Sequence, residues 1–213
     1  MIKLLYIDLF CGAGGTSTGV STARLDGEKC AKVIACVNHD ANAIASHASN
    51  HSEAMHFTED IRTLELSPLI NHLQKSRAEN PEALTVLWAS LECTNFSKAK
   101  GGQPRDADSR TLAEHLFRYI EAINPDYIQI ENVEEFMAIY SIIDIKMRML
   151  MIDELKLIQG FPKDYVLIGT QAEQKKFLGN AVEVTIARKL CEALCAGLTE
   201  YDLTKYRILK QAA

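Results

Sequence analysis

Leu4-Leu5-Tyr6-Ile7, a short apolar run, leads directly into Asp8-Leu9-Phe10-Cys11-Gly12-Ala13-Gly14-Gly15-Thr16-Ser17-Thr18-Gly19. The apolar run predicts a buried strand, and the apolar spacing of Ser17–Leu25 predicts that a helix follows it. Glycines between them let the backbone turn tightly and approach a ligand, while the first turn of a helix offers free amide groups. A glycine-rich turn alone is also compatible with a mere tight connection, but the longer stretch favours a ligand-binding loop.

Apolar runs and helical patterns alternate along the next part of the chain. The expected strands are Leu4–Ile7, Val33–Val37, Thr85–Ala89 and Tyr127–Ile130. The expected helices are Ser17–Leu25, Ala41–Ser49, Pro68–Lys75 and Thr111–Ile123. This order predicts an α/β fold with a doubly wound, mostly parallel sheet covered by helices on both faces. Such sheets bind ligands at the carboxyl ends of their strands, so we expect the site in the segments that follow each strand.

The pattern changes after the strand that ends near Ile130. Val133–Met137 is followed by Ile142–Asp144, and Met147–Gln159 then predicts a helix that ends at Gly160. A last helix is expected over Val182–Leu198.

Composition limits the class of protein. With 213 residues, 47% of them hydrophobic, the chain can bury one substantial core, so we expect one main domain. The net charge of −5 argues against a protein that coats nucleic acid indiscriminately, although it leaves room for a local basic cleft. No apolar run reaches membrane-spanning length, so we expect no membrane insertion and a cytoplasmic protein.

The cysteines form no CxxC pair and no His/Cys cluster at metal-ligand spacing. We therefore expect reduced thiols and no metal site. The cysteines are Cys11, Cys30, Cys36, Cys93, Cys191 and Cys195.

The stretch Asp8–Gly19 resembles the first motif of the cytosine-5 DNA methyltransferases, whose loop holds the methionine part of S-adenosylmethionine. The resemblance implies a Rossmann-like fold of the S-adenosylmethionine-dependent methyltransferase type. In this family an acidic residue after the second strand binds the ribose hydroxyls, and Asn38 takes its place here. Asp60 matches the aspartate that accepts from the adenine amino group; taken alone, it is more typical of a helix cap. The implied cofactor-binding residues are Asp8, Phe10, Gly12, Gly14, Gly15, Asn38, Asp60, Asn180 and Val182.

Cys93 is the candidate nucleophile. It lies in Ala89-Ser90-Leu91-Glu92-Cys93-Thr94-Asn95-Phe96-Ser97, which resembles the family's Pro-Cys-x-x-Phe-Ser motif except that Glu92 replaces the proline. Cytosine carbon-5 is a poor nucleophile, so a thiolate must first add to carbon-6. A lone cysteine is more often a small buried apolar residue, but its place after a strand and the resemblance favour catalysis. A carboxylate at Glu92 would disfavour the thiolate unless it points away or pairs with a lysine.

Glu131 is the second candidate catalytic residue. The sequence Glu131-Asn132-Val133 matches the family's Glu-Asn-Val, whose carboxyl group binds the N3 and amino edge of cytosine. In isolation Glu131 could equally cap the next helix.

A basic, glycine-containing stretch between Lys98 and Arg110 is a candidate loop for contacting phosphates and closing over a base rotated out of duplex DNA. Alone, it would be as typical of a solvated surface loop. The expected substrate-contacting residues are Ser97, Lys98, Lys100, Gly101, Arg105, Arg110 and Asn132.

The resemblance continues near the C-terminus but has a gap before it. Residues 148–162 resemble the family's ninth motif and 177–182 its tenth, in which Glu183 follows where a proline is common. The family's recognition domain and its Gln-x-Arg-x-Arg strand would lie between, where only about fifteen residues are present. We therefore divide the chain into a cofactor-binding and catalytic part (1–139), a junction (140–147) and a C-terminal part (148–213).

The gap leaves three explanations: a deletion, an engineered core, or a sequence from which a segment is missing. We favour the last because the flanking motifs are well kept and the junction has no linker composition.

Three functions also stay open. The leading hypothesis is a DNA cytosine-5 methyltransferase of a restriction–modification system or a phage. The others are a tRNA cytosine-5 methyltransferase of the same fold and a catalytically degenerate S-adenosylmethionine-binding protein.

Overall fold

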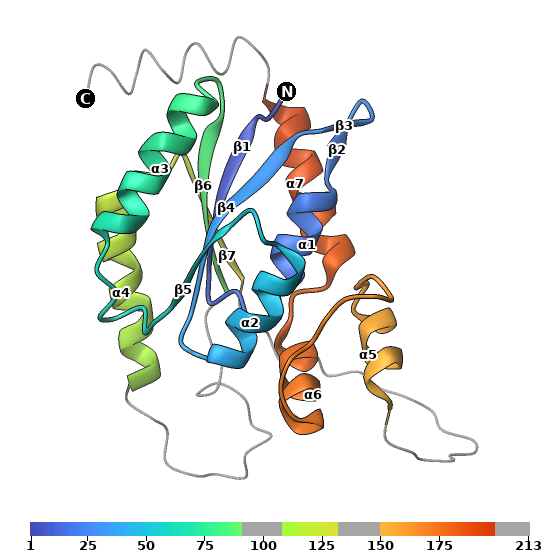
Figure 1. The fold of residues 1–213 in the computed structure, drawn as a ribbon. Helices are drawn as coiled ribbons and strands as arrows, with labels where there is room; N and C mark the ends of the chain where they lie inside the picture. The colour runs from blue at the N-terminus through green and yellow to red at the C-terminus, as the bar shows by residue number, and fades with distance from the viewer. Residues whose placement is uncertain (91–107, 132–149, 199–213) are drawn as a thin grey trace.

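The computed structural model describes residues 1–90, 108–131 and 150–198, and of residues 108–114 the backbone alone. A five-stranded sheet with the order β5-β4-β1-β6-β7 forms its centre (Figure 1), and every neighbouring pair of strands is parallel. The expected doubly wound α/β fold is therefore confirmed. The strands of this sheet are β1 (Leu4–Leu9), β4 (Ala31–Asn38), β5 (Met55–Thr58), β6 (Leu84–Ser90) and β7 (Tyr127–Glu131).

Helices cover both faces of the sheet. In Figure 1, α3 and α4 lie on one side of it and α1 and α7 on the other, with α2 near the carboxyl ends of the strands. Within the described residues, no helix is long and apolar enough to cross a membrane. The helices are α1 (Gly15–Thr22), α2 (Ala41–Asn50), α3 (Ser67–Glu79), α4 (Asp108–Ile123), α5 (Ile152–Ile158), α6 (Gln171–Asn180) and α7 (Val184–Gly197).

The central strand β1 supplies two cores at once. All six of its residues are buried, as expected of a strand with neighbours on both edges and helices on both faces. Because side chains alternate along a strand, Leu5, Ile7 and Leu9 join the core shared with α3 and α4, whereas Leu4 and Tyr6 join the core shared with α7.

The first helix is shorter than expected. It ends at Thr22 rather than at Leu25, because Arg24–Leu25 and Glu28–Lys29 form a small antiparallel hairpin, β2 and β3. Its two-residue turn is Asp26-Gly27, with φ of 52° and 83°. Both turn residues thus have positive φ, which Asp-Gly tolerates well.

Strand β5 is absent from the sequence expectation. Met55–Thr58 is four residues long, and its side chains are exposed or half-buried. It nevertheless pairs with the end of β4, with Asn38 opposite Thr58.

The C-terminal elements also differ from the prediction. Helix α5 begins at Ile152 instead of Met147, and the exposed Met151 N–H donates to the Glu154 carboxylate at 2.9 Å. Helix α6 was not expected, although Thr170 and Glu173 form a capping box at its start. Helix α7 begins at Val184, two residues later than expected.

Glu183 takes over the N-cap of α7 in place of the usual proline. Its carboxylate accepts from the Ile186 N–H at 2.7 Å.

The expected segments Val133–Met137 and Ile142–Asp144 lie outside the described residues.

Candidate cofactor-binding and catalytic site

The carboxyl ends of three neighbouring strands meet at one edge of the sheet. Strand β1 pairs with β6 as far as Leu9 and Ala89, and β6 pairs with β7 as far as Ser90 and Glu131. The glycine-rich loop, the strand end that precedes Cys93, and Glu131 therefore occupy neighbouring positions along that edge.

The loop after β1 has an unusual backbone. Phe10 has a φ of 61°, and Gly12 and Gly14 have φ of 49° and 88°. A phenylalanine in the left-handed region costs energy and is retained where the surroundings hold it, often at functional sites. The Cys11 N–H donates to the Val37 carbonyl at 3.2 Å, which ties the loop to β4. Among the described residues, an added Cβ at Gly12 would meet only the Phe10 carbonyl, at 3.9 Å.

Asp8 is a buried carboxylate near the end of β1, just before this loop, with only 1% of its surface exposed. Its Oδ2 accepts from the Ser17 hydroxyl at 2.7 Å, while Oδ1 has no hydrogen-bond partner among the described residues. Burial raises the pKa of Asp8 to about 7, and the bond from Ser17 opposes the rise. Buried polar atoms are normally paired, so the free Oδ1 fits a site that a donor group of a ligand would complete.

Asn38 ends β4 at the same edge. Its Oδ1 accepts from the Asp40 N–H at 2.9 Å, and Asp40 in turn caps α2 by accepting from the N–H groups of Asn42 and Ala43. The Asn38 Nδ2 makes no hydrogen bond to the described residues, so it is the part of this side chain that can donate to a ligand oxygen.

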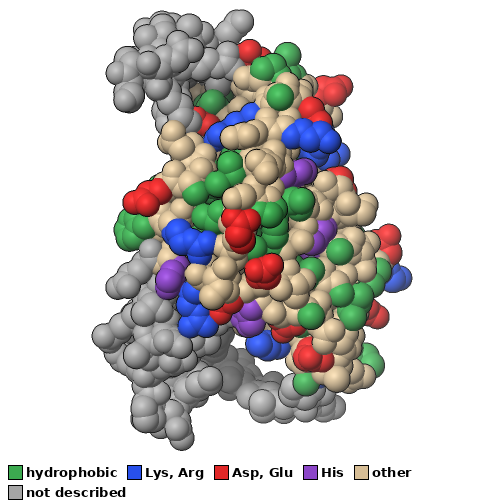
Figure 2. All heavy atoms as spheres, turned by 60° about the vertical axis from the view of Figure 1, so that its left-hand side comes forward, with side chains coloured by type: hydrophobic (Ala, Val, Ile, Leu, Met, Phe, Trp, Pro, Cys, Tyr) green, Lys and Arg blue, Asp and Glu red, His purple; other side chains and the backbone are tan. Residues whose placement is uncertain are grey.

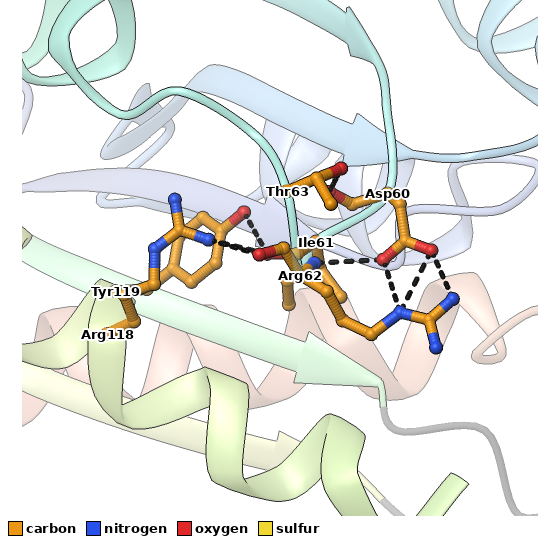
Figure 3. Close-up of polar contacts among 6 residues, drawn as sticks. All are labelled: Asp60, Ile61, Arg62, Thr63, Arg118 and Tyr119. Carbon is orange, nitrogen blue, oxygen red and sulfur yellow. Dashed lines mark hydrogen bonds and ion pairs between the residues drawn. The ribbon is translucent and has the colours of Figure 1, made fainter. Parts of the chain in front are cut away.

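Asp60 follows β5, and its carboxylate is already occupied (Figure 3). Arg62 donates through Nε to both carboxylate oxygens, at 2.9 and 3.0 Å, and through Nη2 to Oδ2 at 2.6 Å. The hydrogen bonds from Arg62 lower the pKa of Asp60 to about 2. The prediction did not include Arg62, and an adenine amino group would share this carboxylate with the guanidinium.

Helix α4 holds the backbone of the Asp60 turn. The Tyr119 hydroxyl donates to the Ile61 carbonyl at 3.0 Å, and Arg118 donates to the Arg62 carbonyl at 2.7 Å (Figure 3). These contacts fix the position of the turn independently of the ion pair.

The C-terminal part packs directly on the glycine-rich loop. A Cβ added to Gly15 would overlap the Val182 carbonyl, so the two backbones are in close contact. The Tyr165 hydroxyl donates to the Ala13 carbonyl. Asn180, in contrast, is exposed at the end of α6. The predicted residues Val182 and Gly15 are therefore brought together.

A buried polar layer beneath the loop was missed by sequence reasoning. The Thr18 hydroxyl lies 3.1 Å from His51 Nε2, and the Tyr165 hydroxyl lies 3.4 Å from the same atom. Burial lowers the pKa of His51 to about 3, so the ring is neutral. No local sequence pattern predicts this layer, because Thr18, His51 and Tyr165 come from three distant segments.

The fold assembles two His/Cys clusters that sequence spacing did not indicate. In each, one potential ligand atom per residue lies within 4.8 Å of the others. Sequence spacing did not indicate them because each cluster joins residues that are far apart in the sequence. The clusters are Cys11, Cys36 and His47, and Cys30, Cys191 and Cys195.

The two clusters differ in their proton affinity. Hydrogen bonding from Cys11, and then from His47 and His56, holds the pKa of Cys36 well below its usual range despite its burial. In the other cluster burial raises the pKa of Cys30 to about 12. A thiolate is therefore favoured at Cys36 but not at its neighbour Cys11, whose pKa burial raises, and a neutral thiol is favoured at Cys30.

Glu131 is half-buried at the end of β7, and burial raises its pKa. The other catalytic candidate, Cys93, lies outside the described residues, as does its neighbour Glu92. Arg110 lies in α4, where only the backbone is described. The remaining substrate-contacting residues also lie outside the described part: Ser97, Lys98, Lys100, Gly101, Arg105 and Asn132.

Charge on the described surface is mixed. On the face shown in Figure 2, acidic and basic side chains alternate around a patch of apolar ones, and neither sign dominates. This face of the described residues therefore offers no broad basic surface of the kind that binds duplex phosphates.

Comparison with protein families gives a match over most of the chain. A family model described as C-5 cytosine-specific DNA methylase matches residues 4–142 and, in a second segment, residues 138–196.

Two curated relatives carry the name of type II methyltransferases. M.AgeI of Thalassovita gelatinovora is 31% identical over 128 residues, which are 60% of this chain and 27% of the relative. M.HgiDI of Herpetosiphon aurantiacus is 39% identical over 56 residues, 26% of this chain and 18% of the relative. The chain thus spans about a quarter or less of these relatives.

Solved structures share the fold at low sequence identity. The Entamoeba histolytica methyltransferase EhMeth gives a TM-score of 0.59 at 13% identity, over 94% of this chain and 100% of that one. A Spodoptera frugiperda DNMT2 mutant gives 0.52 at 12% identity, over 89% and 98%. These identities support a likeness of fold alone.

Proposed function

The chain belongs to the C-5 cytosine-specific DNA methylase family, and from this premise we propose that it transfers a methyl group from S-adenosylmethionine to carbon-5 of cytosine in DNA. One observation carries the proposal. The sheet places the end of β1, with its glycine-rich loop, beside the end of β6 that precedes Cys93, and that end beside Glu131. A cofactor loop, a nucleophile and an acid are the three parts that this reaction needs.

The loop after β1 fits the cofactor on chemical grounds. The buried Asp8 Oδ1 needs a hydrogen-bond donor, which the cofactor's ammonium group can supply. Asn38 Nδ2 can donate to a ribose hydroxyl, and Asp60 can accept from the adenine amino group beside Arg62. We assign cofactor contacts to the full predicted set: Asp8, Phe10, Gly12, Gly14, Gly15, Asn38, Asp60, Asn180 and Val182.

When bound, S-adenosylmethionine would supply an electrophilic methyl group to carbon-5 and would leave as S-adenosylhomocysteine. The Cys93 thiolate adds to carbon-6 of the cytosine, which makes carbon-5 nucleophilic. Glu131 holds the N3 and amino edge of the base and neutralises the charge that develops there. Burial raises the pKa of Glu131, which favours the protonated form that can donate to N3. Loss of the carbon-5 proton and elimination of Cys93 then release the methylated base.

The substrate in this proposal is duplex DNA with the target cytosine rotated out of the helix. The names of both curated relatives, type II methyltransferases, support a role in restriction–modification. The residues proposed to contact DNA are those of the basic loop and its flanks: Ser97, Lys98, Lys100, Gly101, Arg105, Arg110 and Asn132.

We also propose that the residues that recognise the DNA target sequence lie outside the described part of the chain. The family match comes in two segments that meet at residues 138–142. This supports the division at 140–147, with a cofactor-binding and catalytic part before it and a completing part, 148–213, after it. A recognition domain would be connected at that junction.

The test is methyl transfer from radiolabelled S-adenosylmethionine to unmethylated duplex DNA, with tRNA as a parallel substrate. We expect label at carbon-5 of cytosine in DNA, no label in tRNA, and loss of transfer in Cys93→Ser with cofactor binding retained in calorimetry. Cys195→Ala, whose side chain lies in the α7 core, is the matched control and should keep transfer.

Full turnover by Cys93→Ser would overturn the mechanism. Methyl transfer to tRNA alone would show that the proposed DNA substrate is wrong. Cofactor binding without any methyl transfer would show that the protein is a binding module and not an enzyme. Absence of cofactor binding in the unaltered chain would overturn the whole proposal.

A further inference from the structure

Four potential metal ligands from four different elements converge beneath the glycine-rich loop. Cys11 lies in the loop itself, Cys36 in β4, His47 in α2 and His56 in β5. The Cys36 Sγ is 3.5 Å from His47 Nδ1, and His47 Nδ1 is 2.9 Å from His56 Nε2. Cys11, Cys36 and His47 each place a ligand atom within 4.8 Å of the others.

We propose that Cys11, Cys36 and His47, with His56 as the fourth ligand, bind a thiophilic divalent cation, for which zinc is the best fit. Zinc takes sulfur and nitrogen ligands at about 2.3 and 2.0–2.1 Å in a tetrahedron, so its ligand atoms lie about 3.3–3.8 Å apart. The distance between Cys36 and His47 already falls in this range. To complete the tetrahedron, the two histidine nitrogens, now 2.9 Å apart, would have to separate. Cys11 would have to approach His56, which lies outside the group of three whose ligand atoms are all within 4.8 Å of one another.

The donor set also excludes the harder cations. Magnesium and calcium require oxygen ligands, whereas the converging atoms are two thiol sulfurs and two imidazole nitrogens. A mixed Cys₂His₂ set is one of the common structural zinc sites in proteins.

The second cluster, Cys30, Cys191 and Cys195, is the weaker candidate. It offers three sulfurs and no imidazole within the described residues. The Cys195 thiol instead donates to the Cys30 carbonyl at 3.8 Å, and all three residues belong to an apolar core. These cysteines are therefore packing residues and supply a control for the first cluster.

The proposed site is open to metal at one side. Cys36 and His47 are fully buried and Cys11 nearly so, but His56 is half-buried on the edge strand β5. A bound ion would join the loop after β1 to three other elements at the cofactor edge. This inference concerns metal binding and does not depend on methyl transfer.

The first experiment measures metal in the full chain, purified from zinc-supplemented medium without chelator or polyhistidine tag. Mass spectrometry of the metal should find about one zinc per chain. Replacement by Co²⁺ should give the visible spectrum of a tetrahedral ion and the charge-transfer bands of bound thiolate, which report the ligand type directly.

Single substitutions then assign the ligands. Cys36→Ser should abolish stoichiometric zinc, and the partly exposed His56→Gln should weaken cobalt binding by more than the roughly 10–100-fold that loss of an outer-shell partner costs. Cys195→Ala, in the second cluster, should leave both readouts unchanged. Circular dichroism checks that each variant is folded. If Cys36→Ser does not fold, the result for His56→Gln alone decides whether the cluster binds the metal.

Four results would overturn the proposal. The first is unaltered chain that does not retain zinc after dialysis, and the second is zinc retained by both Cys36→Ser and His56→Gln. The third is zinc lost in Cys195→Ala instead. The fourth is a metal-free chain whose unreduced peptide map shows a disulfide joining Cys11 to Cys36, which would make the pair a redox site.

Discussion

The end of β1 and the turn after β5 each present an aspartate at the carboxyl edge of the sheet, but the two carboxylates are held differently. Asp8 is buried and keeps one oxygen without a partner in the described residues, so its pKa rises to about 7. Asp60 is partly exposed and fully engaged by Arg62, so its pKa falls to about 2. In the proposed complex with the cofactor, Asp8 would gain a partner, whereas Asp60 would share its carboxylate between the cofactor and Arg62.

Asp8→Ala gives the largest expected effect. Hydrogen bonds to charged groups contribute about 1.5–3 kcal/mol, so cofactor binding should weaken roughly 10- to 100-fold. Calorimetric titration with S-adenosylmethionine or its demethylated product measures the change. Asp60→Asn is the matched control and should weaken binding less; equal losses in the two variants would remove the distinction between the carboxylates.

Gly15→Ala tests the close contact between Gly15 and the Val182 carbonyl, which supports the glycine-rich loop. The new Cβ overlaps the Val182 carbonyl, and such overpacking costs about 1–3 kcal/mol of unfolding free energy. Urea denaturation measures the loss, and cofactor affinity should fall with it. In Gly179→Ala the new Cβ meets no atom of the other described residues within 4 Å, so this variant should not be destabilised. Equal stability of the two variants would contradict the close contact.

The pH dependence of stability should separate the two carboxylates. For Asp8 the folded pKa lies above the unfolded one, so its contribution is full below about pH 4 and is lost as the pH rises to about 7. The slope there is at most about 1.4 kcal/mol per pH unit. Asp60 has the opposite sign: its contribution is present above about pH 4 and is lost as the pH falls toward 2.

Urea midpoints between pH 4 and 7.5 measure this dependence. Asp8→Asn should flatten the fall in stability over that interval, while Asp60→Asn should change the profile only at lower pH. A profile of Asp8→Asn parallel to that of the unaltered chain would show that Asp8 does not titrate there.

Arg62→Ala gives the smallest expected effect. The ion pair of Arg62 with Asp60 is partly exposed, with side-chain exposures of 37% and 33%, so its removal should cost less than about 1 kcal/mol. If Asp60 accepts from adenine, freeing its carboxylate should leave cofactor affinity equal or severalfold higher. Markedly weaker binding on calorimetric titration would instead assign the cofactor contact to Arg62.

The strands that sequence could predict are those with strong local signals. The buried runs in β1, β4 and β6 are mostly apolar and include β-branched residues, as a sheet covered on both faces requires. Strand β7 was predicted from its apolar pattern alone, and Ile128 and Ile130 are exposed in the described part of the chain. Strand β5 escaped prediction because Met55–Thr58 is short and half-exposed at the sheet edge. Helix α6 escaped because only Phe177 and Leu178 of its residues are buried, which leaves no helical apolar pattern.

The site shows the same limit. Asp8 and the glycines are recognisable because the whole loop is contiguous in sequence. The Arg62 clamp, the hydroxyl of Tyr165 under the loop and the contact of His47 with Cys36 were not predicted, because each depends on a partner whose position only the tertiary fold sets.

The packing of α7 on α1 constrains the order in which parts of the protein can fold. Gly19 lies so close to Ala187 and the Val184 carbonyl that the two helices must seat together. During synthesis the N-terminal loop leaves the ribosome long before the helix that supports it, and contacts between such distant segments form slowly. The packing of α1 against α7 can therefore form only after α7 has been synthesised.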